Sequence, residues 1–362
     1  MAALRTSLTP DFSRPPFAAA PEARFEPAPA DGVLPEGFFS TSNLPTYVRV
    51  NGSWQMPGRP RMDGTIVRRG SSLEVVEPRL VARGEPVAIG LAEDGSEGIV
   101  VYAEGFLGTG SKPNEFRFMS TEVSRERPVN YEEMAERVEC ERREGGYLVW
   151  VVGPALVHSR ARADFEWFIR NGYVQAVLIG NAVAVHDIEA AIFGTTLGMT
   201  NTGQAAAAGH GLHMRAINRV RAAGSIERAV ESGLIASGIM RTLVTQRIPY
   251  VLAGSIRDDG PLPGVISDSL EAQTAMRDHT VRATGAVFIA TALHAIAVGN
   301  MLPSFHNHRG SPEPLMTICV DQTEFVVSKL KDRGTHQAYG VVTNAQDFMH
   351  VLRSYVEKCR PS

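Results

Sequence analysis

The chain has 362 residues, of which 44% are hydrophobic, and its formal net charge is -3 at pH 7. This length suits two domains or one large domain with an appendage, and the apolar fraction is ordinary for a globular protein. Such a small charge, without a basic run interleaved with aromatic residues, argues against nucleic acid or an anionic membrane as a partner.

The cysteines and the apolar runs bear on the compartment. Cys140, Cys319 and Cys359 are scattered and show no CxxC spacing. They predict neither a disulfide framework nor a zinc knuckle, and they favour a reducing, cytoplasmic compartment. No run reaches the roughly 18 apolar residues of a membrane helix, and no apolar h-region opens the chain, so we expect a soluble protein.

Two compositional zones precede residue 128. Residues 1–36 are rich in Pro and Ala and lack periodic apolar positions, which predicts a flexible leader. Residues 37–127 predict a small β-rich domain, with Asn51-Gly52 before Trp54 as a hairpin signal. Its strand-like runs are Tyr47–Val50, Thr65–Val67, Leu73–Val76, Val87–Ile89 and Ile99–Tyr102.

Residues 128–362 predict an α/β domain. Asn130, with Glu133 three residues later, predicts a capped helix that ends at Gly145-Gly146. Short apolar runs then alternate with helix-like segments, a pattern typical of a parallel, doubly wound sheet covered on both faces. These runs are Leu148–Val152, Ala176–Ile179, Tyr250–Ala253, Ala286–Ala290, Met316–Val320 and Ala338–Val342.

Small or polar residues follow almost every run, and ligands of open parallel sheets bind outside the carboxyl ends of the strands. These residues are Gly153-Pro154, Gly180-Asn181, Gly254-Ser255, Thr291, Asp321-Gln322 and Thr343-Asn344. They suit a dinucleotide crevice, although small residues are also found at strand ends simply because tight turns favour them. Because neither GxGxxG nor GxxxxGK[ST] occurs, the dinucleotide site must be a variant one. Asp321 could accept the ribose hydroxyls and so favour NAD over NADP.

The stretch from Val251 to Pro263 combines an apolar strand with charged residues at its end. Arg257, Asp258 and Asp259 stand together in a turn shaped by Gly260 and two nearby prolines. A guanidinium beside two carboxylates suits an amino-acid zwitterion, because arginine can clamp a carboxylate while the acids receive an ammonium group. The alternative is a turn held by its own salt bridge.

Histidines offer weaker signals. His186-Asp187 is predicted to lie at a helix start, where Asp187 could cap the helix. His186 could instead transfer protons, because histidine titrates near neutral pH. His210 and His213 lack HExxH and a third ligand, so we predict no metal site. His306 and His308 are predicted to lie in an exposed loop. No GxSxG elbow supports a serine hydrolase.

Seven segments together resemble one known family. They are residues 42–52 (SNLPTYVRVNG), 152–158 (VGPALVH), 180–189 (GNAVAVHDIE), 213–218 (HMRAIN), 237–240 (SGIM), 251–263 (VLAGSIRDDGPLP) and 298–304 (VGNMLPS). Over roughly residues 37–355 the chain resembles the LOR/SDH family, the NAD-dependent ornithine cyclodeaminases of archaea and of the C-terminal half of cyanobacterial arginine dihydrolases. Two departures are the Pro/Ala leader in place of a longer N-terminal subdomain, and Gly64 where many members carry a Cys.

The resemblance implies a deoxyhypusine-synthase-like NAD-binding fold and conversion of L-ornithine to L-proline and ammonia. In this reaction the substrate is oxidised to an imine, cyclises with loss of ammonia and is reduced by the same cofactor, so no net redox change results. The residues assigned to it on motif position are Asp258 or Asp259 as acid/base, with His186 as runner-up, Arg257 as carboxylate clamp, Asn181 and Asn300 as orienting amides, and Gly153, Pro154, Gly180, Gly254, Ser255 and Asp321 along the NAD site.

Two other functions stay open. The first is a related NAD-dependent enzyme that acts on another diamino acid, such as lysine, or on a saccharopine-type substrate. The second is an NAD-binding regulator without catalytic activity. A glycine- and alanine-rich α/β chain of this type is expected to form a homo-oligomer.

Overall fold

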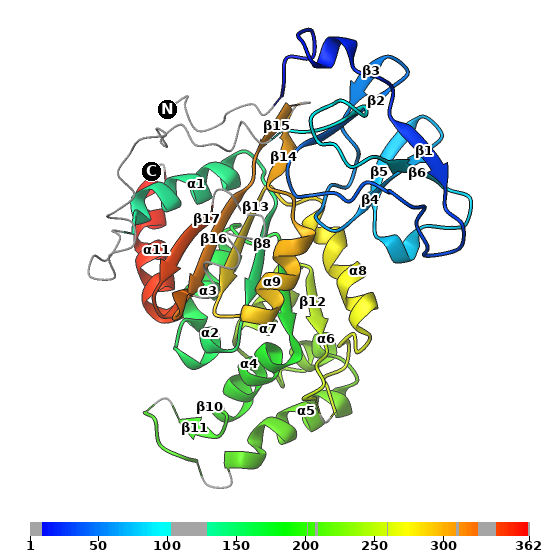
Figure 1. The fold of residues 1–362 in the computed structure, drawn as a ribbon. Helices are drawn as coiled ribbons and strands as arrows, with labels where there is room; N and C mark the ends of the chain where they lie inside the picture. The colour runs from blue at the N-terminus through cyan, green and yellow to red at the C-terminus, as the bar shows by residue number, and fades with distance from the viewer. Residues whose placement is uncertain are drawn as a thin grey trace. The chain divides into compact units, whose positions relative to one another are not determined.

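The computed structural model describes residues 9–102, 129–200, 202–206, 209–258, 260–308, 311–324 and 338–360. These residues belong to two units (Figure 1). The N-terminal unit holds the residues before 129 together with 299–315, and the α/β unit holds residues 129–298, 316–324 and 338–360.

The N-terminal unit is built from antiparallel strands. One sheet has the order β1-β6-β4-β5, with β1 Arg24–Pro27, β4 Thr65–Arg69, β5 Ser72–Val76 and β6 Pro86–Ile89. A second has the order β3-β2-β7, with β2 Thr46–Val50, β3 Ser53–Gln55 and β7 Ile99–Val101. Asn51 and Gly52 both have positive φ between β2 and β3, which confirms the predicted hairpin. The buried side chains of Val48, Ile66 and Ile99 belong to the hydrophobic core of the N-terminal unit.

Two predictions for this unit are wrong. Of the segment predicted as a flexible leader, residues 1–8 lie outside the described residues, and residues 9–36 include β1, which pairs with β6, and Phe12, whose ring stacks on Trp54 at 5.3 Å. Single aromatic residues in this segment pack against the N-terminal unit, and such packing cannot be recognised from a composition rich in Pro and Ala. The segment of His306 and His308 is strand β14 Phe305–His308, paired with β15 Ser311–Pro314, and not an exposed loop.

Gly64, in the N-terminal unit, has a packing reason to lack a side chain. A Cβ at this position would lie 2.5 Å from Cγ1 of Val75 and 3.1 Å from Oγ1 of Thr41. Any larger residue, including cysteine, therefore requires Val75 to move.

The α/β unit contains one parallel sheet in the order β12-β9-β8-β13-β16-β17. Its strands are β8 Leu148–Val152, β9 Ala176–Gly180, β12 Tyr250–Ala253, β13 Gly285–Ile289, β16 Met316–Asp321 and β17 Ala338–Val342. The chain runs from β8 outwards through β9 to β12, then returns to β13 on the other side of β8 and continues outwards. This is the Rossmann strand order, which confirms the predicted doubly wound α/β class.

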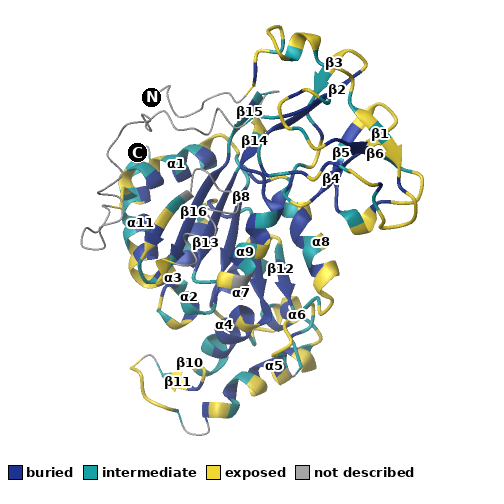
Figure 2. Cartoon of the chain, in the orientation of Figure 1, coloured by how far each residue is buried: buried dark blue, intermediate teal, exposed yellow. Residues whose placement is uncertain are grey.

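Helices cover both faces of this sheet (Figures 1 and 2). Leu148, Trp150 and Val152 of β8 belong to one large core, and the alternate residues Val149 and Val151 are fully buried as well. The helices are α1 Tyr131–Arg143, α2 Ala155–His158, α3 Arg162–Arg170, α4 Asn181–Phe193, α5 Leu212–Ala223, α6 Ile226–Glu231, α7 Ile239–Gln246, α8 Ser269–Thr280, α9 Ala292–Met301 and α11 Ala345–Cys359.

Helix starts in this unit follow the expected capping chemistry. The Oδ1 of Asn130 accepts a hydrogen bond from the backbone N–H of Glu133 at 3.1 Å, which confirms the predicted cap of α1. Asn344 caps α11 in the same way through the N–H of Asp347. None of the helices that the structure describes combines the length and the apolarity needed to cross a membrane.

Candidate active site

The sheet reverses its direction of growth between β8 and β13, and open α/β sheets bind ligands at this switch point. Gly153 follows β8, and its N–H donates to the carbonyl oxygen of Ile289 in β13 at 2.8 Å. A Cβ at Gly153 would lie only 1.8 Å from the carbonyl oxygen of Ala290. Because a backbone oxygen cannot swing away as a side chain can, only glycine fits here.

Ala290, on the other side of the switch point, has a left-handed backbone with φ 51°. Such a conformation is uncommon for a residue with a side chain, and where it persists it often belongs to a functional site. Gly153 and Ala290 thus bring the backbones of two loops together at the carboxyl edge of the sheet, with Pro154 next in the chain.

His294 lies over the neighbouring strand end. Its Cε1 atom would be 2.8 Å from a Cβ at Gly180, so the imidazole occupies the space that a side chain at Gly180 would need. Burial lowers the pKa of His294, which favours the neutral ring. The sequence analysis missed this residue because it considered only the positions directly after each strand. A histidine in the first turn of the helix after β13 was the available signal.

Asn181 and Asp258 are brought together as expected for two residues of one site. The side-chain amide of Asn181 donates to Oδ1 of Asp258 at 2.9 Å, and the N–H of Ser255 donates to Oδ2 at 2.8 Å. The Oδ1 of Asn181 in turn accepts from the N–H of Leu262 at 3.1 Å. Both ends of the segment after β12 are therefore attached to the start of α4.

The turn itself is exposed. Arg257 points its side chain to solvent, and its backbone N–H donates to Oγ of Ser255 at 3.2 Å. The donors to Asp258 that the structure describes are the amide of Asn181 and the N–H of Ser255, and not the guanidinium of Arg257. Asp259 lies outside the described residues.

Gly254 has a second reason to be glycine. A Cβ at this position would lie 3.0 Å from Cα of Ser267 and 3.1 Å from the carbonyl oxygen of Ile266. The N–H of Gly254 also donates to that oxygen at 2.8 Å. Gly254 therefore permits the close approach of residues 266–267 to the edge strand β12.

The prediction that Asp187 caps a helix starting beside it is wrong, because α4 begins six residues earlier, at Asn181. Asp187 is fully buried, and its carboxylate accepts from the N–H groups of Ile239 and Met240 at the start of α7. It also pairs with Nε of Arg162 at 2.6 Å. Asp187 is thus a cap, but of α7, which lies beside α4.

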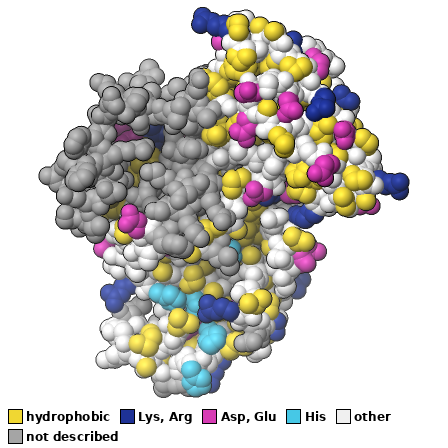
Figure 3. Space-filling view, in the orientation of Figure 1, with side chains coloured by type: hydrophobic (Ala, Val, Ile, Leu, Met, Phe, Trp, Pro, Cys, Tyr) yellow, Lys and Arg dark blue, Asp and Glu magenta, His cyan; other side chains and the backbone are white. Residues whose placement is uncertain are grey.

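His186 lies about 8 Å along α4 from Asn181, at a rise of about 1.5 Å per residue. Its ring stands 4.6 Å from that of His158, and its Nδ1 is 3.7 Å from Glu189. Partial burial and the neighbouring His186 lower the pKa of His158. Histidine side chains gather on the face shown in Figure 3, over the end of the α/β unit that holds α4 and α5.

The two remaining predicted residues lie elsewhere. Asp321 ends β16, and its Oδ1 accepts from the N–H and the hydroxyl of Thr323 at 3.0 and 2.9 Å. Two strand spacings, about 10 Å, separate the ends of β8 and β16. Asn300 lies in the last turn of α9, in the N-terminal unit, and its buried Oδ1 accepts no hydrogen bond from the described residues. Within the described chain, no three His, Cys, Asp or Glu side chains lie close enough to hold a metal ion.

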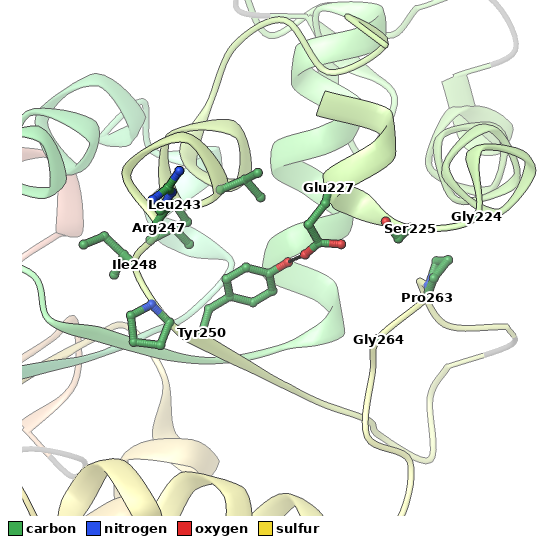
Figure 4. A pocket seen from close by; sticks show the side chains of 11 residues that line it. Gly224, Ser225, Glu227, Leu243, Arg247, Ile248, Tyr250, Pro263 and Gly264 are labelled. Atoms are coloured by element: carbon green, nitrogen blue, oxygen red, sulfur yellow. Dashed lines mark hydrogen bonds between the residues drawn. The ribbon is translucent and has the colours of Figure 1, made fainter. Parts of the chain in front are cut away.

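A cavity of about 580 Å³ lies apart from this carboxyl edge (Figure 4). Its lining includes Tyr250, the first residue of β12, together with Leu243, Arg247 and Ile248. The hydroxyl of Tyr250 donates to Glu227 at 2.6 Å. This cavity is therefore at the amino end of an edge strand, away from the switch point.

Comparison with known proteins assigns the family. Residues 132–352 match the family model of the arginine dihydrolase ArgZ-like C-terminal region with a Rossmann fold, and residues 45–132 match the model of its first region. A Methanopyrus kandleri protein named ornithine cyclodeaminase is 43% identical over 94% of this chain and 79% of its own length.

Two solved structures are also similar. A protein described as a conserved putative LOR/SDH protein from Methanococcus maripaludis has a TM-score of 0.84 and 39% identity, over 93% of this chain and 99% of that one. AgrE in a ternary complex with ornithine and NAD+ has a TM-score of 0.60 and 36% identity, over 94% of this chain and 46% of that one. The relative named AgrE, from Nostoc, is a bifunctional arginine dihydrolase/ornithine cyclodeaminase, 38% identical over 93% of this chain and 47% of its own length. The chain therefore belongs to the ArgZ-like C-terminal family, which the resemblance in its sequence had identified as LOR/SDH.

Proposed function

We propose that this chain is an NAD-dependent ornithine cyclodeaminase that converts L-ornithine to L-proline and ammonia. The observation that carries the proposal is its match, over 94% of the chain, to the ternary complex of a relative with ornithine and NAD+. Archaeal relatives named ornithine cyclodeaminase, about 40% identical over most of the chain, support the same activity.

The switch point fits a dinucleotide. Gly153 lets the loops at the ends of β8 and β13 approach each other closely, and it is at this edge that open parallel sheets bind a dinucleotide. In this proposal Gly153, Pro154, Gly180, Gly254, Ser255 and Asp321 of the α/β unit lie along or near the cofactor. A bound nicotinamide would supply reversible hydride transfer, and the protein would supply orientation and proton transfer.

The substrate groups would be bound from the segment after β12. Arg257 extends into solvent without an ion-pair partner among the described residues, so it is available to clamp the substrate carboxylate. Asp258 would receive a substrate ammonium group, since its carboxylate has lone pairs left after the two bonds it accepts. Asn181 would keep that carboxylate in place. Asp259 and His186 stay candidates for proton transfer.

The experiment follows the hydrogen on the oxidised carbon. Ornithine deuterated at that carbon should give proline that retains deuterium, because a site that excludes water returns the hydride before the reduced cofactor leaves. Free NADH, measured by absorbance beside product mass, should not accumulate. Stoichiometric NADH would show a simple dehydrogenase, and turnover after complete removal of nicotinamide would show a deaminase that needs no hydride transfer. Either result would overturn the proposal.

The purified protein also serves to test the pathway, the substrate and the oligomeric state. We propose a role in proline biosynthesis, a cytoplasmic location and a homo-oligomeric state. A panel of ornithine, lysine and saccharopine-type substrates, each with NAD and NADP, would separate the related activities. Light scattering of the purified protein would give the oligomeric state. Retained NAD without turnover on any amine would favour the regulator.

A further inference from the structure

Amine oxidation requires a group that takes a proton, because an ammonium nitrogen has no lone pair with which to support departure of the hydride. Such a group must lie at the carboxyl edge near the switch point, and it must not already be committed to other partners. His294 meets both conditions. Its ring covers Gly180 at the end of β9, next to the strand β8, which Gly153 follows, and no described residue makes a hydrogen bond to it.

The other titratable groups of this edge are less suited. Both oxygens of Asp258 accept hydrogen bonds that shape the turn. Asp187 is fully buried and bound to Arg162 and the start of α7. His186 lies further along α4 and faces His158 and Glu189. Asp321 is bound to Thr323 at the end of β16.

We propose that His294 is a further catalytic residue of the proposed reaction, where it serves as the acid/base that handles the proton of the reacting amine. Its neutral imidazole takes one proton from the substrate ammonium group, leaving a free amine and an imidazolium. The carbon that bears this amine then loses its hydrogen as hydride to the nicotinamide dinucleotide, and the substrate becomes an iminium ion. The second amine adds to that carbon in its uncharged form and gives up one proton to the solvent. The imidazolium returns its proton to the departing nitrogen, which leaves as ammonia, and the cyclic iminium ion that remains takes the hydride back.

The surroundings of the ring support this role. Burial lowers the pKa of His294, so the ring is neutral near pH 7 and its nitrogen lone pair is free of a proton. Among the described residues, the charged groups at this edge are Arg257 and Asp258, from the segment after β12, and Asp321, from the end of β16, and none of them contributes to this pKa. Gly180 leaves room for the ring, since any side chain there would displace it.

The test compares His294→Gln, His294→Ala and the control His350→Gln, whose side chain is 76% exposed in α11. His294→Gln should lower kcat about a hundredfold or more, the usual scale for an acid/base group, and leave KM and the Kd for NAD within about threefold. The acidic limb of the pH profile, where wild type loses activity as the imidazole becomes protonated, should disappear. His294→Ala should regain activity with added imidazole, and His350→Gln should behave as wild type.

A second readout does not depend on turnover. Because the proton passes from the substrate ammonium group to His294 within the complex, binding of ornithine to the protein with NAD should convert the imidazole of His294 from neutral to protonated, which the ring 15N chemical shifts of labelled histidine report in NMR spectra. The signal that changes should be absent from His294→Gln and present in His350→Gln. The proposal is wrong if His294→Gln keeps more than a third of the wild-type kcat, if its acidic limb is unchanged, or if imidazole fails to rescue a folded His294→Ala. The inference rests on the proposed function. If wild type makes no proline, the proposed function fails, whereas unaffected variants of an active wild type refute His294 alone.

Discussion

One hydrogen bond joins Asn181 to Asp258, and each of them accepts another from a backbone N–H, so the donors and acceptors of these three bonds allow a sharp test. In Asp258→Asn, the new amide N–H would face a donor, either Ser255 or Asn181, so we expect lower stability and turnover reduced about a hundredfold. The reciprocal double variant Asn181→Asp with Asp258→Asn can form all three bonds again. The amide now at position 258 would donate to the carboxylate now at position 181, and that carboxylate would still accept from the N–H of Leu262.

The double variant separates structure from charge. Its melting temperature should return to that of wild type, while turnover should stay at least tenfold low because the carboxylate has moved away from the substrate ammonium group. Thermal unfolding and kcat/KM of the three proteins provide the measurement. Recovery of both properties would mean that Asp258 only shapes the turn.

The residues of the site were predictable to different degrees. Gly153 follows its apolar run directly, Asn181 follows the next run after one glycine, and Asp258 lies in the turn after Ala253. The carboxyl ends of neighbouring parallel strands meet at one edge. His294 was not predicted, because its position over Gly180 depends on the path of α9 back across the sheet. Ala290 was read as the end of a strand, and its left-handed backbone has no sequence signal. Their roles in the reaction stay predictions.

Among the elements, the short hairpin of β10 Thr195–Thr196 and β11 Met199–Thr200 depends on one buried carboxylate. Glu189 of α4 is fully buried and accepts from the hydroxyl of Thr195 and from the N–H groups of Leu197 and Gly198. Burial opposes the charged form, yet the nearby imidazole of His186 and the hydrogen bonds from Gly198, Thr195 and Leu197 outweigh it and lower the pKa of Glu189.

Glu189→Gln should therefore reduce the free energy of unfolding at pH 7 by about 1–3 kcal/mol, since one acceptor becomes a donor opposite an N–H group. The pKa is lower in the folded state, so the stabilisation by Glu189 is complete above its ordinary value of 4.5 and is lost as the pH falls through the folded value. Urea unfolding of wild type and variant at pH 7 and pH 4 should show a smaller difference at pH 4. A difference that does not change with pH would contradict this account. Glu357→Gln, on the exposed side of α11, is a control.

The elements of the α/β unit were predictable because parallel strands are buried on both faces and read as continuous apolar runs. All six runs correspond to strands of the sheet. The start of α4 was placed too late because Asp187 looks like a cap for its own helix, whereas it caps α7 from the interior of α4. β1 escaped detection because it has four residues, of which one is aromatic, in a Pro-rich segment.

On the scale of the whole molecule, the strand order fixes where the two halves of a dinucleotide can lie. In the usual Rossmann arrangement, the acid that binds the ribose follows the second strand, which is β9 here and is followed by Asn181. Asp321 follows the fifth strand, on the other side of the switch point. The placement of the ribose at Asp321 therefore requires a variant orientation of the cofactor, in keeping with the absent GxGxxG.

Asp321→Arg tests that orientation through the stability of the entire chain. A ligand that binds only the folded state adds about 2.7 kcal/mol of stability at a concentration one hundred times its Kd. If Asp321 accepts the ribose hydroxyls, the variant should lose most of the thermal shift that NAD produces. It should gain a shift with NADP, because arginine can pair with a 2′-phosphate. The control Glu324→Arg makes the same charge change three residues later, at an exposed position, and should keep the wild-type preference. If Asp321→Arg responds to both cofactors as wild type does, the ribose does not lie at β16, and the next position to test is Asn181 at the end of β9.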